Sequence, residues 1–557
     1  MVKRKVRQAS RPKSASETKL FESLLKQASS GYAKELPNRT ISICPECLEI
    51  IPAVIFEEKD KVMLLKKCPK HGVFKEVYWA SVEMYNNARR FAYDGKGVEN
   101  PHVKKANPAC PKDCGLCSLH KSHTALANLV VTNRCDLNCW YCFFLAGKAG
   151  YVYEPTLEQL RQAVRLVTQE QPVKCNAIQI TGGEPSLRED IIDIINMIRE
   201  EGVDHIQYNT NGIKLANDPD FAAKLREAGV NTLYLSFDGV TPKTNPKNHY
   251  EIPYVLENSR KSGLGIVLVP TVIKGVNDHE IGDIIRFGFK NMDVVRGVNY
   301  QPVSLVGRMP RSHREKHRIT IPEVIQRIEE QTNGEITKED FYPVPSVKAI
   351  TDFVEALTHK AQYSLSAHFA CGMATYVFNE DGRMVPITKF VDVEGIFEYL
   401  EEKACELNKG KSRLIIGLKL LCKLNSFIDK KKAPKGFSLS KILYNALMKH
   451  DYRALGAFHH HSLFIGMMHF QDLYNYDVNR VKRCVIHYTT PEAVMPFCTF
   501  NVIPEWYREK VQKKYSIPVK DWEKKHGKLE NLLYKRNIEK LSSTEIYRKT
   551  YEGFLRQ

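Results

Sequence analysis

Three cysteines stand close together in the segment NRCDLNCWYCFF, where Cys135, Cys139 and Cys142 have the spacing C-x3-C-x2-C. Three thiolates at this spacing can hold three irons of a cubic four-iron cluster and leave the fourth iron open to an outside ligand. A structural cluster or a zinc turn is the alternative. Because the triplet follows an apolar strand-like run and precedes a series of strand-then-helix units, the sequence favours the open cluster.

A second group lies nearer the N-terminus, where a C-P-x-C turn and a C-P-x-H-G turn flank a β-hairpin pattern. Two such turns around one tetrahedral ion form a zinc-ribbon or rubredoxin-like site. The predicted ligands are Cys44, Cys47, Cys68 and His71. The spacing does not distinguish zinc from iron, and we favour a structural ion over an iron that relays electrons.

The remaining cysteines differ in their spacing. One group repeats the C-x3-C-x2-C spacing without a preceding strand and predicts an auxiliary iron–sulfur cluster, with a second zinc site as the alternative: Cys110, Cys114 and Cys117. Three dispersed cysteines each lie by a short β-like segment followed by turn residues, and for them we predict a second auxiliary cluster: Cys371, Cys484 and Cys498. Isolated cysteines are usually buried as small apolar residues, the role expected of Cys175, Cys405 and Cys422.

From residue 128 onward, short apolar runs alternate with segments of helical period. The strand-like runs are NLVVTN, NAIQI, HIQYN, NTLYLSF, LGIVLVPTV and VVRGVNYQPV, and helical periodicity is clear in TLEQLRQAVRLV, EDIIDIINMIRE and DFAAKLREAG. Such β-then-α units imply a parallel sheet with active groups at the carboxyl ends of its strands. The predicted fold class is α/β, a partial (βα)6 barrel with an N-terminal metal ribbon and a C-terminal auxiliary-cluster domain.

Shifts in composition divide the chain into six predicted parts. They are a basic arm (1–39), a rubredoxin or zinc-ribbon-like module (40–93), a linker with the auxiliary cluster motif (94–125), the partial barrel (126–309), a C-terminal auxiliary-cluster and substrate domain (310–504) and a basic helical tail (505–557). The tail is expected to be solvated.

The composition, 43% apolar and 26% charged over 557 residues, is that of a globular chain with a large core. The net charge of +18 indicates an anionic partner. No apolar run reaches the roughly 18–20 residues that cross a bilayer, and the basic, serine-rich start is not a secretory signal. We therefore expect a cytoplasmic protein that can sit peripherally at a membrane, in which the 15 cysteines serve as metal ligands or nucleophiles rather than disulfides.

Two unusually apolar stretches, 412–424 and 457–470, are expected to be core helices. Walls of an apolar substrate tunnel, or a surface against a membrane, are the alternatives. A basic cluster follows the sixth strand and is either a solvated loop or an anion contact: Arg308, Arg311, His313, Arg314, Lys316, His317 and Arg318.

The cysteine triplet is followed, at the end of the second strand, by a GGEP motif consisting of Gly182, Gly183, Glu184 and Pro185. The two motifs in this order, over about 180 residues, resemble the radical S-adenosylmethionine (SAM) enzymes. The resemblance implies that SAM binds the open iron through its amine and carboxylate. One electron from the cluster would then break the carbon–sulfur bond and give a 5′-deoxyadenosyl radical.

The same resemblance implies the residues that hold SAM. The glycines let the backbone approach the methionine amine, Glu184 accepts from that ammonium group, and Tyr141 lies against the adenine. The other implied contacts lie at strand ends, with Asn209, Asn211, Ser236 and Asp238 for ribose and carboxylate, and Gln301 and Pro302 for adenine. For each of these residues alone, a turn or cap role is the alternative.

The order of all the cysteine groups, over roughly residues 40–505, resembles an archaeal subgroup of these enzymes that contains the tetraether lipid synthase. The resemblance implies a synthase that couples the terminal carbons of two phytanyl chains of archaeal diether phospholipids through an sp3–sp3 carbon–carbon bond, after hydrogen abstraction by the 5′-deoxyadenosyl radical. Some relatives are described as methylases of a reduced hydroxymethylpterin. The alternative is therefore a radical SAM methyltransferase that acts on 7,8-dihydro-6-hydroxymethylpterin in methanopterin biosynthesis.

The implied cofactors are SAM, one radical SAM [4Fe-4S] cluster, two auxiliary [4Fe-4S] clusters and one mononuclear iron or zinc. The implied partners are the diether phospholipid, an anionic membrane surface and a reduced electron donor such as ferredoxin. A nucleic-acid-binding zinc ribbon would explain the positive net charge, but it would not explain the GGEP motif and the barrel. We therefore expect no nucleic-acid partner. A long aliphatic tunnel would favour the lipid, and a polar bowl the pterin.

Overall fold

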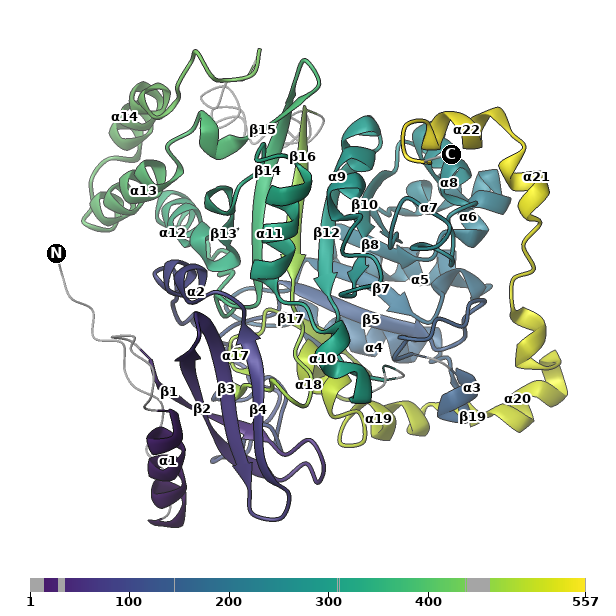
Figure 1. Cartoon of the computed structure of the whole chain (residues 1–557), viewed down its shortest axis with the longest axis horizontal. Helices are drawn as coiled ribbons and strands as arrows, with labels where there is room; N and C mark the ends of the chain where they lie inside the picture. Colours follow the sequence, from purple (N-terminus) through teal and green to yellow (C-terminus); the bar gives the residue numbers. More distant parts are fainter. Residues whose placement is uncertain are drawn as a thin grey trace.

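The computed structural model describes residues 15–28, 36–144, 146–307, 309, 311–435, 437 and 461–555 (Figure 1). Among these residues, the strands form a four-stranded N-terminal sheet, one large sheet of 13 strands and a two-stranded ribbon. No helix in the described ranges is both long enough and apolar enough to cross a bilayer.

The N-terminal module is an antiparallel sheet in the order β1-β2-β3-β4. Its elements are β1 (Asn38–Ile43), β2 (Ile50–Glu58), β3 (Lys61–Cys68) and β4 (Gly72–Trp79), with α1 (Ala15–Ala28) before them and α2 (Val82–Arg89) after them. Phe21 and Leu24 of α1 are buried against Val54 and Phe56 of β2. The two predicted cysteine turns therefore lie where strands of one rigid sheet end.

The six predicted strands form the parallel centre of the large sheet. They are β5 (Leu126–Thr132), β7 (Ala177–Gly182), β8 (His205–Thr210), β9 (Thr232–Ser236), β10 (Gly265–Val269) and β12 (Val295–Pro302), with β11 (Thr271–Val272) beside β12. The helices between them are α3 (Ala146–Ala149), α4 (Leu157–Thr168), α5 (Ile191–Glu200), α6 (Ile213–Asn217), α7 (Pro219–Ala228), α8 (Ile252–Ser262) and α9 (Ile281–Lys290). The α/β fold class with its parallel sheet is confirmed.

Strands from the C-terminal half extend this sheet at both ends (Figure 1). Beyond β12 lie β16 (Ser462–Met468), which is parallel to it, and then the antiparallel strands β14 (Gly372–Glu380), β13 (Tyr342–Pro343) and β15 (Arg383–Pro386). Beyond β5 lie the parallel strand β17 (Ile486–Thr489) and the antiparallel strand β18 (Val494–Pro496). The residues after 310 thus share a sheet with the barrel strands.

The helix expected over 457–470 is wrong for residues 462–468, which form strand β16, while residues 457–460 lie outside the described residues. A short apolar run has the same composition in a buried helix and in a strand with neighbours on both sides, so periodicity does not separate them. Here β16 lies between β12 and β14, and Leu463, Ile465 and Met467 are buried on one face.

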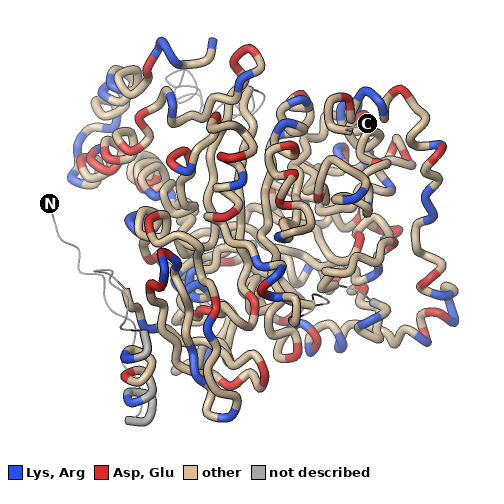
Figure 2. The backbone as a smooth tube through the Cα atoms, in the orientation of Figure 1, with Lys and Arg blue, Asp and Glu red and all other residues tan. Residues whose placement is uncertain are grey.

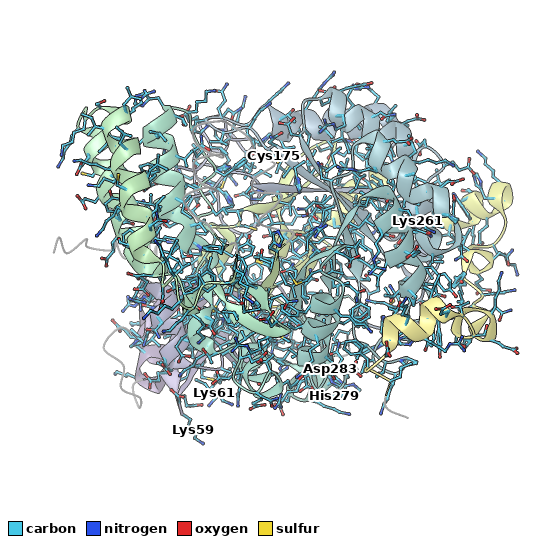
Figure 3. All side chains as sticks on the ribbon, turned by 90° about the horizontal axis from the view of Figure 1, so that it is seen from above. Lys59, Lys61, Cys175, Lys261, His279 and Asp283 are labelled. Carbon is cyan, nitrogen blue, oxygen red and sulfur yellow. The ribbon has the colours of Figure 1, made fainter. Side chains whose placement is uncertain are left out.

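Three helices form a separate layer beside β14: α12 (Lys348–Thr358), α13 (Val393–Asn408) and α14 (Arg413–Leu424). The core helix expected over 412–424 exists, but only one stripe of α14 is buried, at Ile416, Leu420 and Leu424. Cys405 and Cys422 are exposed rather than buried, because they lie on the outer faces of these helices. Cys175, in contrast, is buried next to β7, as expected (Figure 3).

The remaining elements follow the barrel and the C-terminal strands. They are α10 (Arg314–His317), α11 (Ile321–Gln331), α17 (Val478–Val481), α18 (Phe497–Val502), α19 (Arg508–Lys514), α20 (Val519–His526), α21 (Ile538–Ser542) and α22 (Glu545–Tyr551), with β19 (Ser516–Pro518) pairing with β6 (Tyr151–Tyr153). The C-terminal segment is basic and helical (Figure 2). It is not fully solvated, because Tyr547 and Tyr551 are buried against His249 of the barrel.

Candidate functional site

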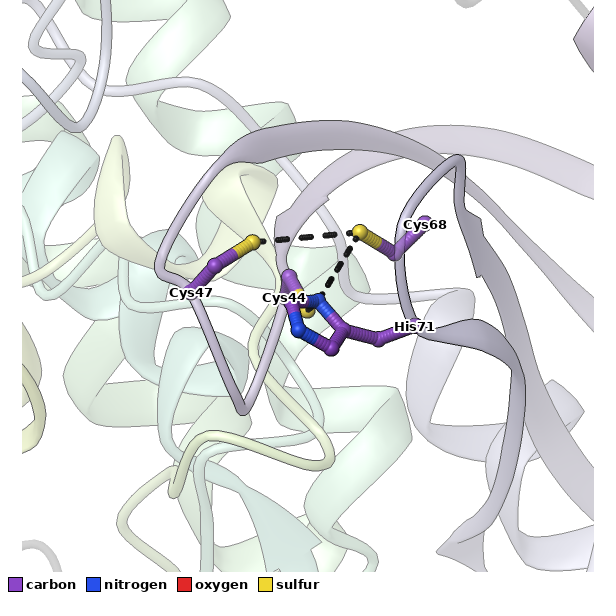
Figure 4. Close-up of side chains that lie close together, drawn as sticks. All are labelled: Cys44, Cys47, Cys68 and His71. Atoms are coloured by element: carbon purple, nitrogen blue, oxygen red, sulfur yellow. Dashed lines mark hydrogen bonds between the residues drawn. The ribbon is translucent and has the colours of Figure 1, made fainter.

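The ribbon turns bring four predicted metal ligands together (Figure 4). Cys47 Sγ lies 3.8 Å from Cys68 Sγ, and His71 Nδ1 lies 3.6 Å from Cys44 Sγ and 3.5 Å from Cys68 Sγ. Ligands about 2.3 Å from a tetrahedral ion lie roughly 3.8 Å apart, so these four atoms fit one ion without rearrangement. The prediction that Cys44, Cys47, Cys68 and His71 form one site agrees with this geometry.

The cysteine triplet lies on the loop that follows β5, and all three thiols are partly exposed. Backbone amides point at two of the sulfurs, since Leu137 N donates to Cys135 Sγ at 3.4 Å and Phe144 N donates to Cys142 Sγ at 3.3 Å. Such amides stabilise negative sulfur, so the loop fits a thiolate-ligated cluster. Burial, followed by the nearby Asp136 and Glu184 carboxylates, raises the pKa of the Cys135 thiol while no metal binds it.

The two glycines of GGEP are required by close backbone contact with the segment that leads into the cysteine loop. A Cβ at Gly182 would lie 2.0 Å from the backbone oxygen of Thr132, and one at Gly183 would lie 2.0 Å from that of Arg134. The amides of Gly183 and Glu184 donate to these same two oxygens, at 2.8 and 2.7 Å. The motif therefore fixes the entry to the cysteine loop, and any larger side chain would push the two segments apart.

Glu184 is buried and joins the ends of two strands. Its carboxylate accepts hydrogen bonds from the Ser186 amide (3.1 Å), the Thr210 hydroxyl (3.0 Å) and the Asn211 amide (2.7 Å). Burial and the neighbouring Asp136 carboxylate raise the pKa of Glu184 to about 7. Contact between Glu184 and the ammonium group of SAM stays a prediction, whereas its role in fixing the β7 and β8 ends follows directly from these bonds.

Asp136 and Asn211 connect the cysteine loop to β8. Asn211 Nδ2 donates to the Asp136 carboxylate at 2.6 Å, and Asn211 Oδ1 accepts from the Ile213 amide. Asp136 was not among the predicted site residues, although an acidic residue directly after Cys135 was a visible signal in the sequence. Burial raises its pKa, an effect the Asn211 bond partly opposes.

Tyr141, Asp238 and Lys247 form a buried network next to the cysteine loop. The Tyr141 hydroxyl donates to Asp238, Lys247 forms a 2.7 Å ion pair with Asp238, and Lys247 also donates to the Tyr141 oxygen at 3.1 Å. The other Asp238 oxygen accepts from the Thr271 amide. This network ties the aromatic residue between Cys139 and Cys142 to the end of β9. Sequence reasoning missed Lys247, which lies in a polar loop without a recognisable pattern.

The other predicted SAM contacts lie along the same edge of the sheet. Asn209 donates to the Thr181 hydroxyl at 3.2 Å, and the Ser236 carbonyl accepts from Asn248. Gln301 and Pro302 pair with β11 at the end of β12, and Pro185 starts a short 3-10 turn after Glu184. Their direct contact with SAM stays a prediction.

Cys114, of the predicted auxiliary triplet, contacts residues of the C-terminal half of the chain. Cys114 Sγ donates to the Thr499 hydroxyl at 3.4 Å, and the Cys114 amide donates to the Tyr507 hydroxyl at 3.1 Å. The neighbouring Cys114 thiol and burial raise the pKa of Cys110, and burial and Cys114 raise that of Cys117. That Cys110, Cys114 and Cys117 hold one cluster stays a prediction.

One apolar cluster contains members of three cysteine groups: the triplet after β5, the predicted auxiliary triplet and the dispersed C-terminal cysteines. Its buried members include Cys114 and Cys498, and Cys142 packs against it. Aromatic rings fill the space between them, including Phe144, Tyr476 and the stack of Tyr488 on Phe500, whose centroids are 4.3 Å apart. The sequence did not reveal that these cysteines share one apolar cluster, because β16 and β17 join the sheet beside strands far away in the chain.

The basic cluster after β12 mainly holds the ribbon module against the barrel. Arg314 and Arg318 form ion pairs with Glu76 of β4 at 2.5 and 3.1 Å, and Arg318 also pairs with Asp472 at 2.9 Å. Arg311 donates to the carbonyl of Pro45, in the metal turn itself. Arg314 and Arg318 therefore pair with carboxylates of the protein itself, whereas Arg311, His313 and Lys316 are exposed, as expected of a solvated loop, and Arg308 lies outside the described residues.

Comparison with known proteins agrees with this geometry. The Radical SAM superfamily matches residues 129–288, and the HMPTM N-terminal zinc ribbon domain matches residues 36–80. The chain is 47% identical to 7,8-dihydro-6-hydroxymethylpterin dimethyltransferase from Methanocaldococcus jannaschii over 502 residues. This alignment covers 88% of this chain and 98% of that protein. GTP 3′,8-cyclase from Limosilactobacillus fermentum is 35% identical over 187 residues, 31% of this chain and 53% of that protein.

A solved structure of the radical SAM methyltransferase TsrM from Kitasatospora setae aligns with 42% of this chain and 46% of its own, at 12% identity. Its TM-score of 0.24 is too low to support an argument about function.

A parallel sheet with the cysteine triplet after its first strand and GGEP after its second is the architecture of a radical SAM enzyme. The chain belongs to the radical SAM superfamily and, within it, to the group that carries the HMPTM zinc ribbon and includes the M. jannaschii protein. The enzyme class is thus confirmed, and the ribbon family favours zinc over iron for the four-ligand site. When bound, the [4Fe-4S] cluster supplies the electron that splits SAM.

Proposed function

We propose that this protein is a radical SAM methyltransferase that acts on a reduced pterin, 7,8-dihydro-6-hydroxymethylpterin. The observation that carries the proposal is the 47% identity to the M. jannaschii dimethyltransferase over 98% of that protein's length. This identity supports the pterin alternative over the coupling of lipid chains, which none of the similar proteins reported above has in its name.

The site supports this proposal in two ways. Its cysteine groups surround an apolar cluster rich in aromatic rings, and flat heterocycles bind well against such rings. The Tyr141, Asp238 and Lys247 network adds polar groups at the same edge of the sheet. A pterin has flat apolar faces and a hydrogen-bonding edge, and the proposal places it between this cluster and this network.

The test uses the full chain, reconstituted anaerobically with iron and sulfide and supplied with reductant, SAM and 7,8-dihydro-6-hydroxymethylpterin. We expect deoxyadenosine together with pterin products that are heavier by one and two methyl groups, by mass spectrometry. SAM carrying an isotope label in its methyl group identifies the methyl source. The variant Cys135→Ala/Cys139→Ala/Cys142→Ala should yield neither product. Deoxyadenosine without any methylated pterin would contradict the substrate assignment.

Coupling of archaeal diether lipids is the second candidate, and helix α14 is the observation that favours it. Its Leu414, Leu418 and Ile415 are 73%, 64% and 54% exposed and are the three most exposed large apolar side chains among the described residues. Exposed basic residues lie around them, as on helices that rest on anionic membranes: Lys411, Arg413, Lys419, Lys423, Lys430, Lys431 and Lys432 (Figure 2). Parallel incubation with diether phospholipid distinguishes this candidate, because only lipid coupling yields a joined chain.

A cavity of about 400 Å3 lies beside α9 and the β14–β15 hairpin. Arg286, Lys290 and Glu335 line it, so its walls are not the aliphatic surface that a phytanyl chain requires. It gives the lipid candidate no support.

A further inference from the structure

Three cysteines far apart in the chain border elements of the C-terminal half. Cys371 precedes β14, Cys484 precedes β17, and Cys498 lies in the first turn of α18. Burial, followed by the nearby Cys498 and Cys371 thiols, raises the pKa of Cys484. The Gln471 amide donates to Cys498 Sγ at 3.4 Å. Arg480 donates to Cys371 Sγ, and Gln471 and Arg480 both lie in the segment that leads to Cys484. The three cysteines are therefore all attached to residues 471–484, as the predicted second auxiliary cluster requires.

Arg480 lies among these sulfurs with no carboxylate to neutralise it. Its side chain is almost completely buried, and it forms no ion pair with an acidic residue in the described part of the chain. Arg480 Nε donates to Cys371 Sγ at 3.3 Å, and Nη2 donates to the His469 carbonyl. Its Nη1 has no hydrogen-bond partner among the described residues. A buried, unpaired guanidinium is costly, so the site requires a negative group beside Cys371.

His469 is the second side chain that points to a missing group. It is 1% exposed, and neither ring nitrogen has a hydrogen-bond partner within the described ranges. Its amide donates to the Cys371 carbonyl at 2.9 Å, which extends the antiparallel register in which Gly372 pairs with Met468. Residues directly opposite in such a pair have side chains on the same face of the sheet. The imidazole and the Cys371 side chain therefore extend from the same face of the sheet.

We propose that Cys371, Cys484 and Cys498 hold an auxiliary iron–sulfur cluster whose fourth protein ligand is His469, with Arg480 as its counter-ion. Imidazole nitrogen ligates iron in some iron–sulfur centres, and three thiolates with one neutral imidazole leave the cluster anionic. That negative charge neutralises Arg480, and the iron gives an imidazole nitrogen the partner it lacks. The proposal adds to the proposed function without depending on the identity of the substrate.

The experiment removes the radical SAM cluster by using the full chain with Cys135→Ala/Cys139→Ala/Cys142→Ala, reconstituted anaerobically and labelled with 15N-histidine. We expect hyperfine coupling of histidine nitrogen to the reduced auxiliary cluster. His469→Ala should abolish this coupling, whereas His368→Gln, at a buried histidine whose Nδ1 accepts from the Ala370 amide, should retain it. His469→Cys should keep the iron content of the parent chain and lose the nitrogen coupling. This variant distinguishes loss of the imidazole from misfolding of the alanine variant.

The counter-ion role is measured by redox titration. A nearby cation stabilises the more negative, reduced cluster, so Arg480→Gln should lower its midpoint potential and Arg480→Lys should lower it less. Nitrogen coupling that survives His469→Ala, or an iron content unchanged by Cys484→Ala, would overturn the proposal. None of these measurements uses a pterin. If the nitrogen coupling and the iron content behaved as expected but the enzyme methylated no pterin, the result would contradict the proposed substrate and not the cluster proposal.

Discussion

Replacing Lys247 tests the organisation of the cysteine loop most directly. Its ammonium group lies 2.7 Å from Asp238, and the two side chains are only 9% and 6% exposed. Lys247→Met keeps the aliphatic stem and removes the charge. The variant therefore leaves a buried carboxylate that is held by the neutral donors Tyr141 and the Thr271 amide.

The expected cost follows from this burial. Removing one partner of a buried ion pair costs about 3–5 kcal/mol, and we expect ~3 kcal/mol because two hydrogen bonds to Asp238 remain. Adding Asp238→Asn removes the uncompensated charge. The double variant should therefore be more stable than Lys247→Met by ~1–2 kcal/mol, although it carries one more substitution.

Hydrogen exchange of the amides in residues 132–144 measures this effect, because local opening is better defined than global unfolding in a chain of this size. A loss of ~3 kcal/mol corresponds to roughly 100-fold faster exchange. Lys243→Met, at an exposed position in the same loop, should leave the rates unchanged. If the double variant instead shows the sum of the two single effects within ~0.5 kcal/mol, charge pairing does not hold the loop.

The glycine pair, one buried carboxylate and helix α14 give three further expected outcomes. A Cβ at Gly183 would lie 2.0 Å from a backbone oxygen, so Gly183→Ala should weaken SAM binding at least tenfold in calorimetry, whereas Gly417→Ala, with nothing within 4 Å, should not. Burial raises the pKa of Glu170 from 4.5 to about 7, so wild-type stability falls as pH rises through this range. Glu170→Gln should gain up to ~3 kcal/mol relative to wild type by pH 8, and a pH-independent difference would refute this. Replacing Leu414 and Leu418 by Ser should abolish sedimentation with anionic vesicles and spare deoxyadenosine formation; equal sedimentation would remove the support for membrane contact.

The parallel strands were predictable because each is a short, continuous apolar run followed by a helix whose apolar residues recur at helical spacing. Leu160, Val164 and Val167 of α4 show this pattern, and all three are buried. The two strands that extend the sheet near the cysteines, β16 and β17, were not predictable. Their neighbours β12 and β5 lie far away in the sequence, and no local sequence pattern indicates which distant strands pair with each other.

The same distinction applies to the site. Ligands within one or two turns leave a spacing that can be read directly, as Cys44 and Cys47 do. A side chain whose role depends on a partner from another element has no characteristic spacing in the sequence. Lys247 lies in a polar loop, and His469 follows a strand that was expected to be a helix. The role of Lys247 follows from its buried ion pair with Asp238, and the role proposed for His469 follows from two buried ring nitrogens without a hydrogen-bond partner among the described residues.

The ribbon, the barrel and the C-terminal segment also depend on one another through a single stretch of backbone. Residues 471–477 accept a hydrogen bond from Lys66 at the Leu473 carbonyl (2.6 Å) and one from Ser42 at the Tyr476 carbonyl (2.6 Å). Both donors belong to the ribbon, and Ser42 is two residues from the metal ligand Cys44. The Gln471 amide of the same stretch donates to Cys498 Sγ. Lys66 is fully buried, and its ammonium group also donates to the Ser42 hydroxyl and the Ile43 carbonyl of the ribbon, so the Leu473 carbonyl is one of three acceptors that solvate it. The stretch 471–477 therefore joins the ribbon, two residues from Cys44, to Cys498 by a short series of hydrogen bonds, and a change in the ribbon turns would be transmitted to Cys498 along it.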